Sequence, residues 1–303
     1  MHSHNSPEIA FKKIGIIGLG LIGGSLAKAF RHIAHIERIV VADVNRATAD
    51  AALAAGCADA VVAMDAPNFV CAFDGCDALF ICIPPHAACA MVTRFKGANI
   101  GIVTDVTSVK MPIMKAAEGM GNFIGGHPMA GSEGSGFGSA DTHLFAKSTY
   151  VMCIPEDCTL LEDDIDAYRQ LVMSIGANPI VMDAMAHDCR VAVISHLPHV
   201  AAFALSTIVE ESHDAEMRSL IGGGFRDTTR IAASSPSLWA DIMSASSQLP
   251  AAIDEYVNIL CRLRDLIQTG KTEELQSKLA TSSEFRSSIP EGLRASKLRG
   301  NAQ

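Results

Sequence analysis

The chain has 303 residues, with 24 Lys and Arg against 33 Asp and Glu, so its formal net charge is −9. At about 150 residues per domain, this length suggests two domains. The net acidity argues against nucleic-acid partners, which require clustered cations, and the 49% share of hydrophobic residues is too high for a disordered chain. We therefore expect a globular, two-domain protein whose partner is a small molecule.

The N-terminal residues and the cysteines favour an intracellular protein. Residues 1–7 are polar and lack the basic and then apolar order of a signal peptide, and no apolar run reaches the ~20 residues that a membrane helix needs. The nine cysteines form no Cys-x-x-Cys pair and lie mostly among apolar neighbours. This pattern favours buried thiols over disulfides or zinc ligands. We expect a cytoplasmic protein without a membrane partner.

Short apolar segments alternate with helix-compatible stretches through the first half of the chain. A helix is expected over residues 25–33, and strands are expected over residues 12–17, 39–42, 78–83, 100–104, 123–125 and 150–154. Strands that alternate with helices predict an α/β domain with a parallel, doubly wound sheet.

The first strand ends in the run Gly18-Leu19-Gly20-Leu21-Ile22-Gly23, and a helix follows. In this context the glycines predict dinucleotide binding, since Gly18 and Gly20 let the backbone approach a pyrophosphate and Gly23 lets the helix pack on the strand. Asp43 lies 20 residues after Gly23, where a carboxylate bonds the ribose hydroxyls and repels a 2′-phosphate. NAD is therefore favoured, although the nearby Arg46 leaves NADP open.

From residue 184 the apolar pattern becomes helical, and Asp183 is placed to cap the first of these helices. We expect a dinucleotide-binding domain over residues 1–182 and an all-helical domain over residues 183–303. A helical domain without a sheet of its own often completes its core by dimerising, so a homodimer is expected.

His127 is the first candidate for chemistry, in the segment Gly125-Gly126-His127-Pro128-Met129-Ala130-Gly131-Ser132-Glu133. Pro128 restricts His127 to an extended backbone at the end of a strand, which is where doubly wound sheets bind ligands. A histidine there can accept a proton from a hydroxyl near neutral pH. The alternative is a loop histidine with only a structural hydrogen bond.

The helix that begins near residue 184 carries a polar stripe. At about 100° per residue one narrow face holds Asp188, Ala192, Ser195 and His199. Pro198 removes a hydrogen bond and should kink the helix. His187 and His196 are about half a turn apart, which argues against a shared metal ion, and no metal is expected.

Two more segments carry polar groups, and each has two possible roles. Residues 222–224 are all glycine and permit close backbone approach, and Arg226 and Arg230 follow them. Arg230 either binds a carboxylate or forms an exposed ion pair with Asp227. Ser108 follows a strand, so it either caps a helix or lies near the nicotinamide end of the dinucleotide.

Together the glycine motif, Gly126-His127-Pro128-Met129-Ala130-Gly131, Ser195-His196-Leu197-Pro198-His199 and Arg226-Asp227-Thr228-Thr229-Arg230-Ile231-Ala232 resemble the prephenate/arogenate dehydrogenases. The resemblance runs from about Lys12 to the 280s. It implies oxidative decarboxylation of prephenate to 4-hydroxyphenylpyruvate in tyrosine biosynthesis, with NAD as acceptor and a homodimer built through the helical domains.

The resemblance also implies roles for matching residues. His127 takes the proton of the ring hydroxyl, Ser108 orients that hydroxyl, and Arg230 clamps a carboxylate of the dianionic substrate. The remaining positions are His199 and Ser195 in the pocket wall, Ser132 and Glu133 near the substrate side chain, His187, Asp188 and Asp227 in a network that positions Arg230, and Trp239 near the dimer-side wall. The cofactor positions are Gly18, Gly20, Leu21, Ile22, Gly23 and Asp43.

Three alternatives stay open. Arogenate differs from prephenate only by an amine in place of a keto group, and Glu133 is the residue placed to favour one of them. A hydroxyacid or imine reductase also pairs this nucleotide fold with a helical domain, although neither matches the His-Pro-Met-Ala-Gly segment. A nucleotide sensor without catalysis is the alternative that is not an enzyme.

Overall fold

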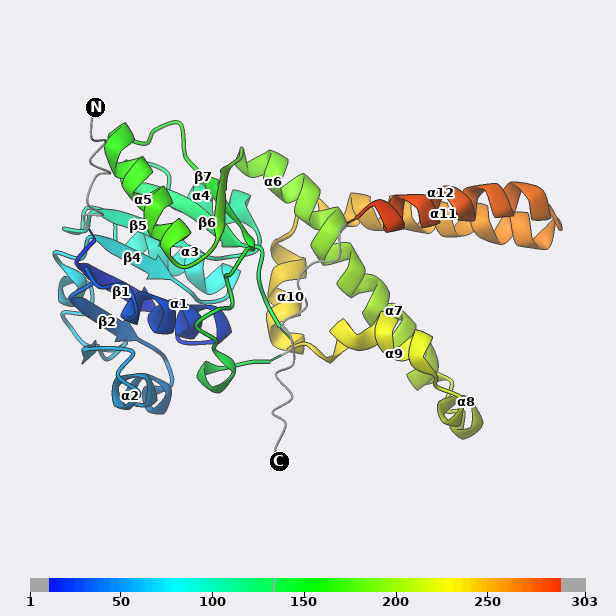
Figure 1. Ribbon diagram of the computed structural model, residues 1–303, viewed down its shortest axis with the longest axis horizontal. Coiled ribbons are helices and arrows are strands. Elements are labelled where there is room, and N and C mark those ends of the chain that lie inside the picture. The colour runs from blue at the N-terminus through cyan, green and yellow to red at the C-terminus, as the bar shows by residue number, and fades with distance from the viewer. Residues whose placement is uncertain (1–10, 133, 290–303) are drawn as a thin grey trace, which may run out of the picture. The chain divides into compact units, whose positions relative to one another are not determined.

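A computed structural model describes residues 11–132 and 134–289 of the chain (Figure 1). The chain divides into two compact units, Met1–Leu249 and Pro250–Gln303. This division lies C-terminal to residue 182, where the sequence pattern changes from α/β to helical. The first unit therefore contains the whole sheet together with the first helices of the helical half.

Within the described residues, eight strands form one sheet in the order β3-β2-β1-β4-β5-β6-β7-β8. The strands are β1 (Lys13–Ile17), β2 (Arg38–Ala42), β3 (Ala60–Val61), β4 (Ala78–Ile81), β5 (Ile102–Asp105), β6 (Phe123–Pro128), β7 (Thr149–Cys153) and β8 (Asn178–Val181). The part from β3 to β6 is parallel and has the strand order of a dinucleotide-binding fold, as expected.

The expectation of a fully parallel sheet is wrong at one place, because β6 and β7 pair antiparallel. Parallel neighbours need a long crossover, usually a helix. In its described part, the connection between β6 and β7 contains only the short turn η2 (Phe137–Ser139), so the chain reverses direction instead. The sequence analysis also missed β3, which has two residues, and β8, which is mostly exposed and contains Pro179.

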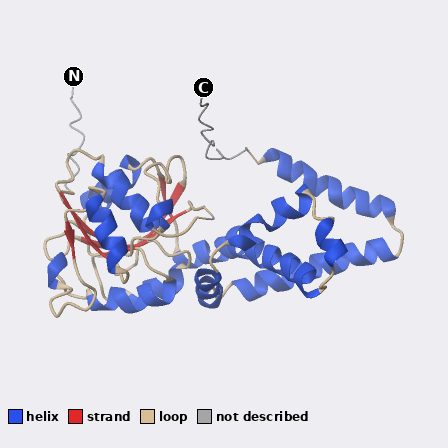
Figure 2. Cartoon of the chain, turned by 90° about the horizontal axis from the view of Figure 1, so that it is seen from below, coloured by secondary structure: helices blue, strands red, loops and turns tan. Residues whose placement is uncertain are grey.

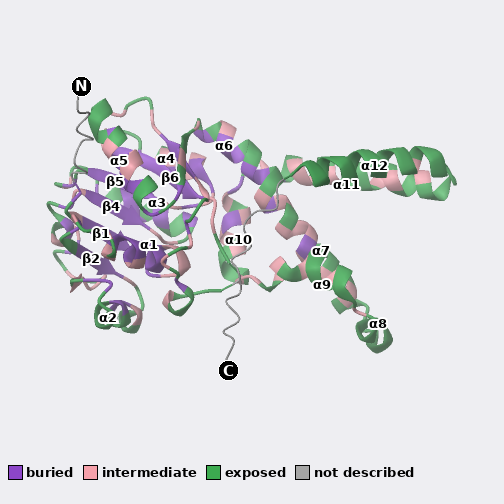
Figure 3. Ribbon diagram, in the orientation of Figure 1, coloured by how far each residue is buried: buried purple, intermediate pink, exposed green. Residues whose placement is uncertain are grey.

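Helices cover both faces of the sheet. One core cluster joins the sheet to α1 (Leu21–Arg31), α2 (Arg46–Ala54) and α5 (Glu162–Ser174). The other joins it to α3 (Pro85–Arg94), α4 (Lys110–Ala116) and the turn η1 (Cys71–Phe73). The buried residues accordingly gather on the strands and on the helix faces turned toward them (Figure 3).

Helix α1 begins four residues before the expected start at Ser25. Gly20 is its N-cap residue, and no side chain caps this end and no acidic residue lies in the first turn. The first backbone N–H groups of a helix have no partner within the helix, and the positive end of the helix dipole lies among them. The structure thus leaves this helix end ready for an anionic ligand.

The helical part of the first unit is built from α6 (Ala184–Val191), the π-helical turn η3 (Ala192–His196), α7 (Leu197–Glu211), α8 (Ala215–Ser219), α9 (Gly223–Thr229), the turn η4 (Arg230–Ala233) and α10 (Pro236–Ala245). The expected cap is confirmed, since Asp183 Oδ1 accepts a hydrogen bond from the backbone N–H of Ala186 at 2.8 Å. Pro198 lies just after η3, so the disturbance expected from this proline takes the form of a π-helical turn.

The stretch Ala184–Glu211 forms one helix of 28 residues. Its most apolar window of 18 residues has a mean hydropathy of 1.6, and 22% of that window is buried. By length and composition alone this helix is apolar enough to cross a membrane. Polar residues such as Ser195, His196 and His199 interrupt this helix, so it contains no unbroken apolar run of the ~20 residues that a membrane helix needs. The helix continues through Pro198, as the expectation of one kinked helix implied.

The second unit begins one residue into α11 (Leu249–Gln268) and contains α12 (Thr272–Ser288), and a turn around Gly270 joins the two helices (Figure 2). Among the described residues of these two helices only Leu249 is buried. Several apolar side chains are exposed on them, including Val257, Leu260, Leu279 and Phe285. The all-helical character expected after residue 183 is confirmed for the described residues.

Candidate active site

His127 lies one residue before the end of β6 and is only 6% exposed. Its strand runs parallel to β5 and continues through Pro128, beyond the expected strand over residues 123–125. The carboxyl ends of parallel strands form the edge where doubly wound sheets bind ligands. The imidazole is thus held at this edge by regular backbone structure and not by a mobile loop.

A chain of hydrogen bonds runs from His127 into the protein. His127 Nδ1 lies 2.8 Å from His187 Nε2, and His187 Nδ1 lies 2.8 Å from Asp188 Oδ1. The Asp188 carboxylate also accepts hydrogen bonds from the backbone N–H groups of Lys110 and Met111, at 2.7 and 2.9 Å. His187 and Asp188 are both buried. The structure therefore places these two residues behind His127, whereas the sequence analysis expected them to position Arg230.

The sequence analysis missed a buried ion pair beside His127. The ammonium group of Lys110 is fully buried, pairs with Asp105 and donates a hydrogen bond to the carbonyl oxygen of Gly126. Asp105 Oδ1 accepts from the N–H of Gly126 at 3.1 Å, and Asp105 Oδ2 accepts from the hydroxyl of Thr107 at 2.6 Å. The pair therefore holds both the N–H and the carbonyl group of Gly126, the residue before His127. An aspartate at a strand end followed five residues later by a lysine was the available signal.

The environment keeps His127 neutral near pH 7. Burial lowers the pKa of His127 well below its usual value of 6.5, and the nearby His187, Lys110 and His196 lower it further. Burial acts in this direction because it disfavours the charged imidazolium. A neutral imidazole has one nitrogen with a lone pair, so His127 can accept a proton from a ligand that reaches it.

A second group of ring side chains lies on the long helix and α10. His199 stacks on Trp239 with ring centroids 3.4 Å apart, and its Nδ1–H donates to the carbonyl oxygen of Ser195 at 3.0 Å. His196 Nδ1 lies 3.0 Å from the hydroxyl of Ser246. His196 Nε2 is buried and has no partner in the described part of the chain, and burial lowers the pKa of His196 to about 4. His196 was not among the site residues predicted from the sequence.

The π-helical turn changes which histidines lie on one side of the helix. Regular helical spacing puts His187 and His196 half a turn apart. Both are nevertheless buried, and each lowers the pKa of His127. Their separation includes η3, whose wider turn rotates the residues that follow it. Across residues 11–132 and 134–289, no group of three or more His, Cys, Asp or Glu side chains is arranged to hold a metal ion.

The other expected site residues lie outside the hydrogen-bonded groups described above. Ser108 is half-buried in the loop between β5 and α4, whereas Arg230, Asp227 and Ser132 are exposed. Arg230 begins η4, which packs against α7. Glu133 lies outside the described residues. The roles expected for these five residues remain predictions.

The glycine motif forms a tight turn with open space in front of α1. Gly18 has a φ of 91°, and a Cβ atom there would lie 2.4 Å from the carbonyl oxygen of Cys82. A Cβ atom at Gly23 would lie 1.9 Å from the carbonyl oxygen of Gly18. A Cβ atom at Gly20 would meet nothing within 4 Å. A phosphate group can therefore approach the N–H groups at the start of α1 without a steric barrier.

Asp43 at the end of β2 completes this nucleotide site. Its two carboxylate oxygens accept hydrogen bonds from the backbone N–H groups of Leu19 and Asn45, both at 2.7 Å. Each oxygen has a second lone pair, so both can still accept ribose hydroxyls. Arg46 Nε pairs with Asp50 Oδ1 at 2.8 Å on the helix surface. The residues present therefore fit NAD, and the arginine that left NADP open is engaged elsewhere.

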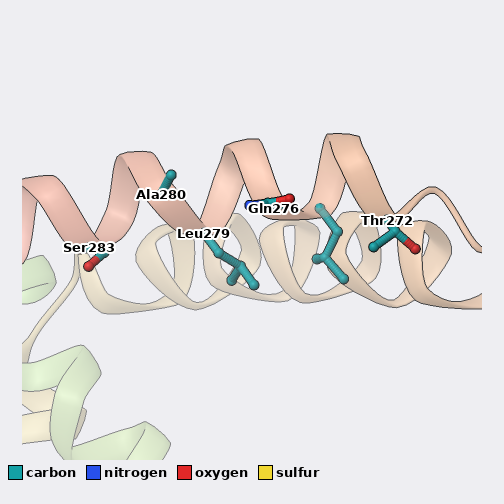
Figure 4. Close-up of a pocket in the computed structure, with 6 residues that line it drawn as sticks. Thr272, Gln276, Leu279, Ala280 and Ser283 are labelled. Carbon is teal, nitrogen blue, oxygen red and sulfur yellow. The ribbon is translucent and has the colours of Figure 1, made fainter.

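A hollow on helix α12 is separate from these groups. It is lined by Thr272, Leu275, Gln276, Leu279, Ala280 and Ser283, all from one helix (Figure 4). Its lining holds no ionisable side chain, so it offers no group for acid–base chemistry.

Two family models match the chain over most of its length. Residues 26–181 match the nucleotide-binding domain of prephenate dehydrogenase, and residues 183–281 match its dimerization domain. Prephenate dehydrogenase of Bacillus subtilis is 29% identical over 288 residues, which cover 91% of this chain and 75% of that protein. Cyclohexadienyl dehydrogenase of Zymomonas mobilis is 32% identical over 269 residues, which cover 85% of this chain and 89% of that protein.

A solved structure agrees with these matches. Prephenate dehydrogenase from Aquifex aeolicus, crystallised with hydroxyphenyl propionate and NAD+, superposes with a TM-score of 0.85 and 27% sequence identity. The match covers 93% of this chain and 99% of that one.

Proposed function

This chain belongs to the prephenate dehydrogenase family of NAD-dependent oxidoreductases, and we propose that it converts prephenate to 4-hydroxyphenylpyruvate by oxidative decarboxylation in tyrosine biosynthesis. The observation that carries this proposal is the buried, neutral His127 at the carboxyl edge of the sheet, on the same edge as the nucleotide motif. A base at this position suits a substrate that loses a hydroxyl proton as its ring carbon is oxidised.

In the proposed reaction His127 acts as the general base. Its Nε2 atom takes the proton of the ring hydroxyl, and Ser108 orients that hydroxyl. NAD, when bound, supplies the acceptor for the hydride from the carbon that bears the hydroxyl. Loss of the ring carboxylate as carbon dioxide then leaves an aromatic ring. The gain of aromaticity favours product formation.

The remaining site residues act in binding. Arg230 clamps a carboxylate of the substrate through its paired donors, and Asp227 supports it. We assign Ser195 and His199 to the pocket wall, and Ser132 and Glu133 to recognition of the substrate side chain. NAD is held by Gly18, Gly20, Leu21, Ile22, Gly23 and Asp43. The functional division is a dinucleotide-binding domain over residues 1–182 and a substrate and dimerisation domain over residues 183–303.

The protein acts as a cytoplasmic homodimer in this proposal, without nucleic-acid or membrane partners. Apolar side chains are exposed on α7, α11 and α12, and Ile208 of α7 is 64% exposed. A second copy of the chain covers such faces in a dimer. A lipid bilayer does not suit the long apolar helix, because it carries His187, Asp188 and His196, which are buried within the protein.

The test is a direct assay of the purified protein. With prephenate and NAD, the absorbance of NADH should rise, and one molecule of carbon dioxide should be released for each NADH formed. The assignment is wrong if neither prephenate nor arogenate is turned over with NAD or NADP. The same assay with prephenate and with arogenate decides between the two substrates. If Glu133 contacts the keto or amine group, Glu133→Gln should change the ratio of kcat/KM for the two.

A further inference from the structure

We propose that His187 and Asp188 set the tautomer of His127, so that His127 carries its ring hydrogen on Nδ1 and its lone pair on Nε2. The inference rests on the proposed function for the identity of the reaction, but the tautomer itself belongs to the protein alone. It makes His187 and Asp188 positioning residues, which act on the substrate only through His127.

The donor and acceptor of each hydrogen bond between Asp188, His187 and His127 follow from the carboxylate at one end. An ionised carboxylate can only accept, so Asp188 receives the hydrogen of His187 Nδ1 across 2.8 Å. With its single ring hydrogen on Nδ1, His187 has its lone pair on Nε2, and that nitrogen accepts from His127 Nδ1 across 2.8 Å. His127 must supply that hydrogen, and its own lone pair is left on Nε2. The nitrogen that faces away from the relay is thereby the basic one.

The far end of the relay is held in place by backbone. Asp188 lies on α6 and accepts from two consecutive N–H groups at the start of α4, those of Lys110 and Met111. Two such bonds fix the orientation of the carboxylate. The rings of His127 and His187 meet edge-on, with an interplanar angle of 76°. This geometry directs a ring nitrogen of each histidine at the other.

The other charged or titratable groups beside His127 do not offer this hydrogen bond. Lys110 directs its ammonium group at Asp105 and the carbonyl oxygen of Gly126. His196, on η3, directs Nδ1 at Ser246. Among the described residues, it is therefore His187 whose side chain forms the hydrogen bond with His127 Nδ1.

The first test reads the tautomer by NMR without any substrate. In protein labelled with ¹⁵N-histidine, the chemical shifts of the two ring nitrogens show which one carries the hydrogen, and the spectrum of His127→Asn assigns the His127 signals. We expect the hydrogen on Nδ1 in the wild type. A hydrogen on Nε2 overturns the proposal, whether or not the enzyme turns over prephenate.

The second test changes the relay. His187→Phe keeps a ring but removes the acceptor, so the His127 hydrogen should move to Nε2, because an unpaired buried donor is costly. We expect kcat to fall about 10- to 100-fold with little change in KM. His187→Gln offers an oxygen to His127 and an N–H to Asp188, so it should restore most of the turnover and the wild-type tautomer.

His35→Phe is the matched control, because it makes the same change at a histidine in the loop between α1 and β2. A kcat for His187→Phe equal to that of this control, with an unchanged His127 tautomer, overturns the proposal. If His187→Phe fails to fold, the wild-type spectrum and the His187→Gln variant still decide. If the wild type turns over neither substrate, the proposed function fails while the spectrum still decides the tautomer.

Discussion

The sheet and the helices after residue 196 bury their side chains very differently. Every residue of β4, β5 and β6 is buried. Among the described residues of helices α7 to α12, only Ala202, Ile242 and Leu249 are buried (Figure 3). The first region completes its core within the chain, whereas the second exposes apolar faces that need a covering surface. The scaffold that holds His127 is therefore self-contained, while the elements that carry Arg230 depend on a partner in our proposal.

The largest effect is expected for His127→Asn, a substitution in the sheet region, whose core is complete within the chain. Asparagine cannot act as a base at this position, so kcat should fall by about 10² to 10⁴. KM should change little, because the binding groups proposed for the substrate lie elsewhere. Steady-state kinetics with prephenate and NAD measures both constants. A variant with wild-type kcat would remove His127 from the chemistry.

Arg230→Ala makes the matching change in the helical region. The loss of a charge-assisted pair with a carboxylate costs about 1.5–3 kcal/mol, so KM should rise about 10- to 100-fold while kcat falls less. The contrast with His127→Asn is the point of the experiment, because one region should govern turnover and the other binding. An unchanged KM would show that Arg230 does not clamp the substrate.

Ile208→Asp tests whether a second copy covers α7. Ile208 is 64% exposed in the single chain, and a charge buried there in a dimer should weaken association by about 100-fold or more. Light scattering after gel filtration should then report a monomer. Met173→Asp is the matched control, since Met173 is 57% exposed on α5, in the self-contained region. A dimer that survives Ile208→Asp would place the interface on another surface.

The stability of the protein should also depend on pH. Burial lowers the pKa of His127 well below 6.5 and that of His196 to about 4. The unfolded chain therefore binds more protons than the folded one below pH 6.5, and the free energy of unfolding should fall as the pH drops from 6.5 toward 4. Each histidine contributes at most about 1.4 kcal/mol per pH unit.

Urea denaturation at pH 7.5, 5.5 and 4.5 measures this slope. His196→Gln removes one titrating group from the helical region and His127→Asn removes one from the sheet region. Each variant should show a shallower slope than the wild type. Equal slopes in all three proteins would mean that neither buried histidine resists protonation.

Local patterns allowed much of the fold to be predicted. The expected strand over residues 12–17 is β1 (Lys13–Ile17), and the expected strand over residues 150–154 is β7 (Thr149–Cys153), because apolar runs between turn residues report burial directly. The direction of β7 could not be predicted, because it depends on how the segment between β6 and β7 crosses the sheet edge and not on the residues of the strand.

The candidate site was predictable only in part, for the same reason. His127 could be placed at a strand end from Pro128 and the preceding glycines, since these act on the local backbone. Its partner His187 is 60 residues away. That contact exists only because α6 packs against α4 and brings Asp188 to the backbone N–H groups of Lys110 and Met111. Hydrophobic periodicity carries no information on such a pairing.

The 303 residues by themselves determined the dinucleotide motif, the change from α/β to helical structure and the identity of the histidine at the strand end. These features arise from backbone conformation and periodicity, which are local properties. Only the tertiary structure decided which groups surround His127: the Lys110–Asp105 pair, His196 after the π-helical turn, and the His187–Asp188 relay. The reason is physical, since hydrogen bonds in a buried site depend on distances and angles that are set when separate elements pack together.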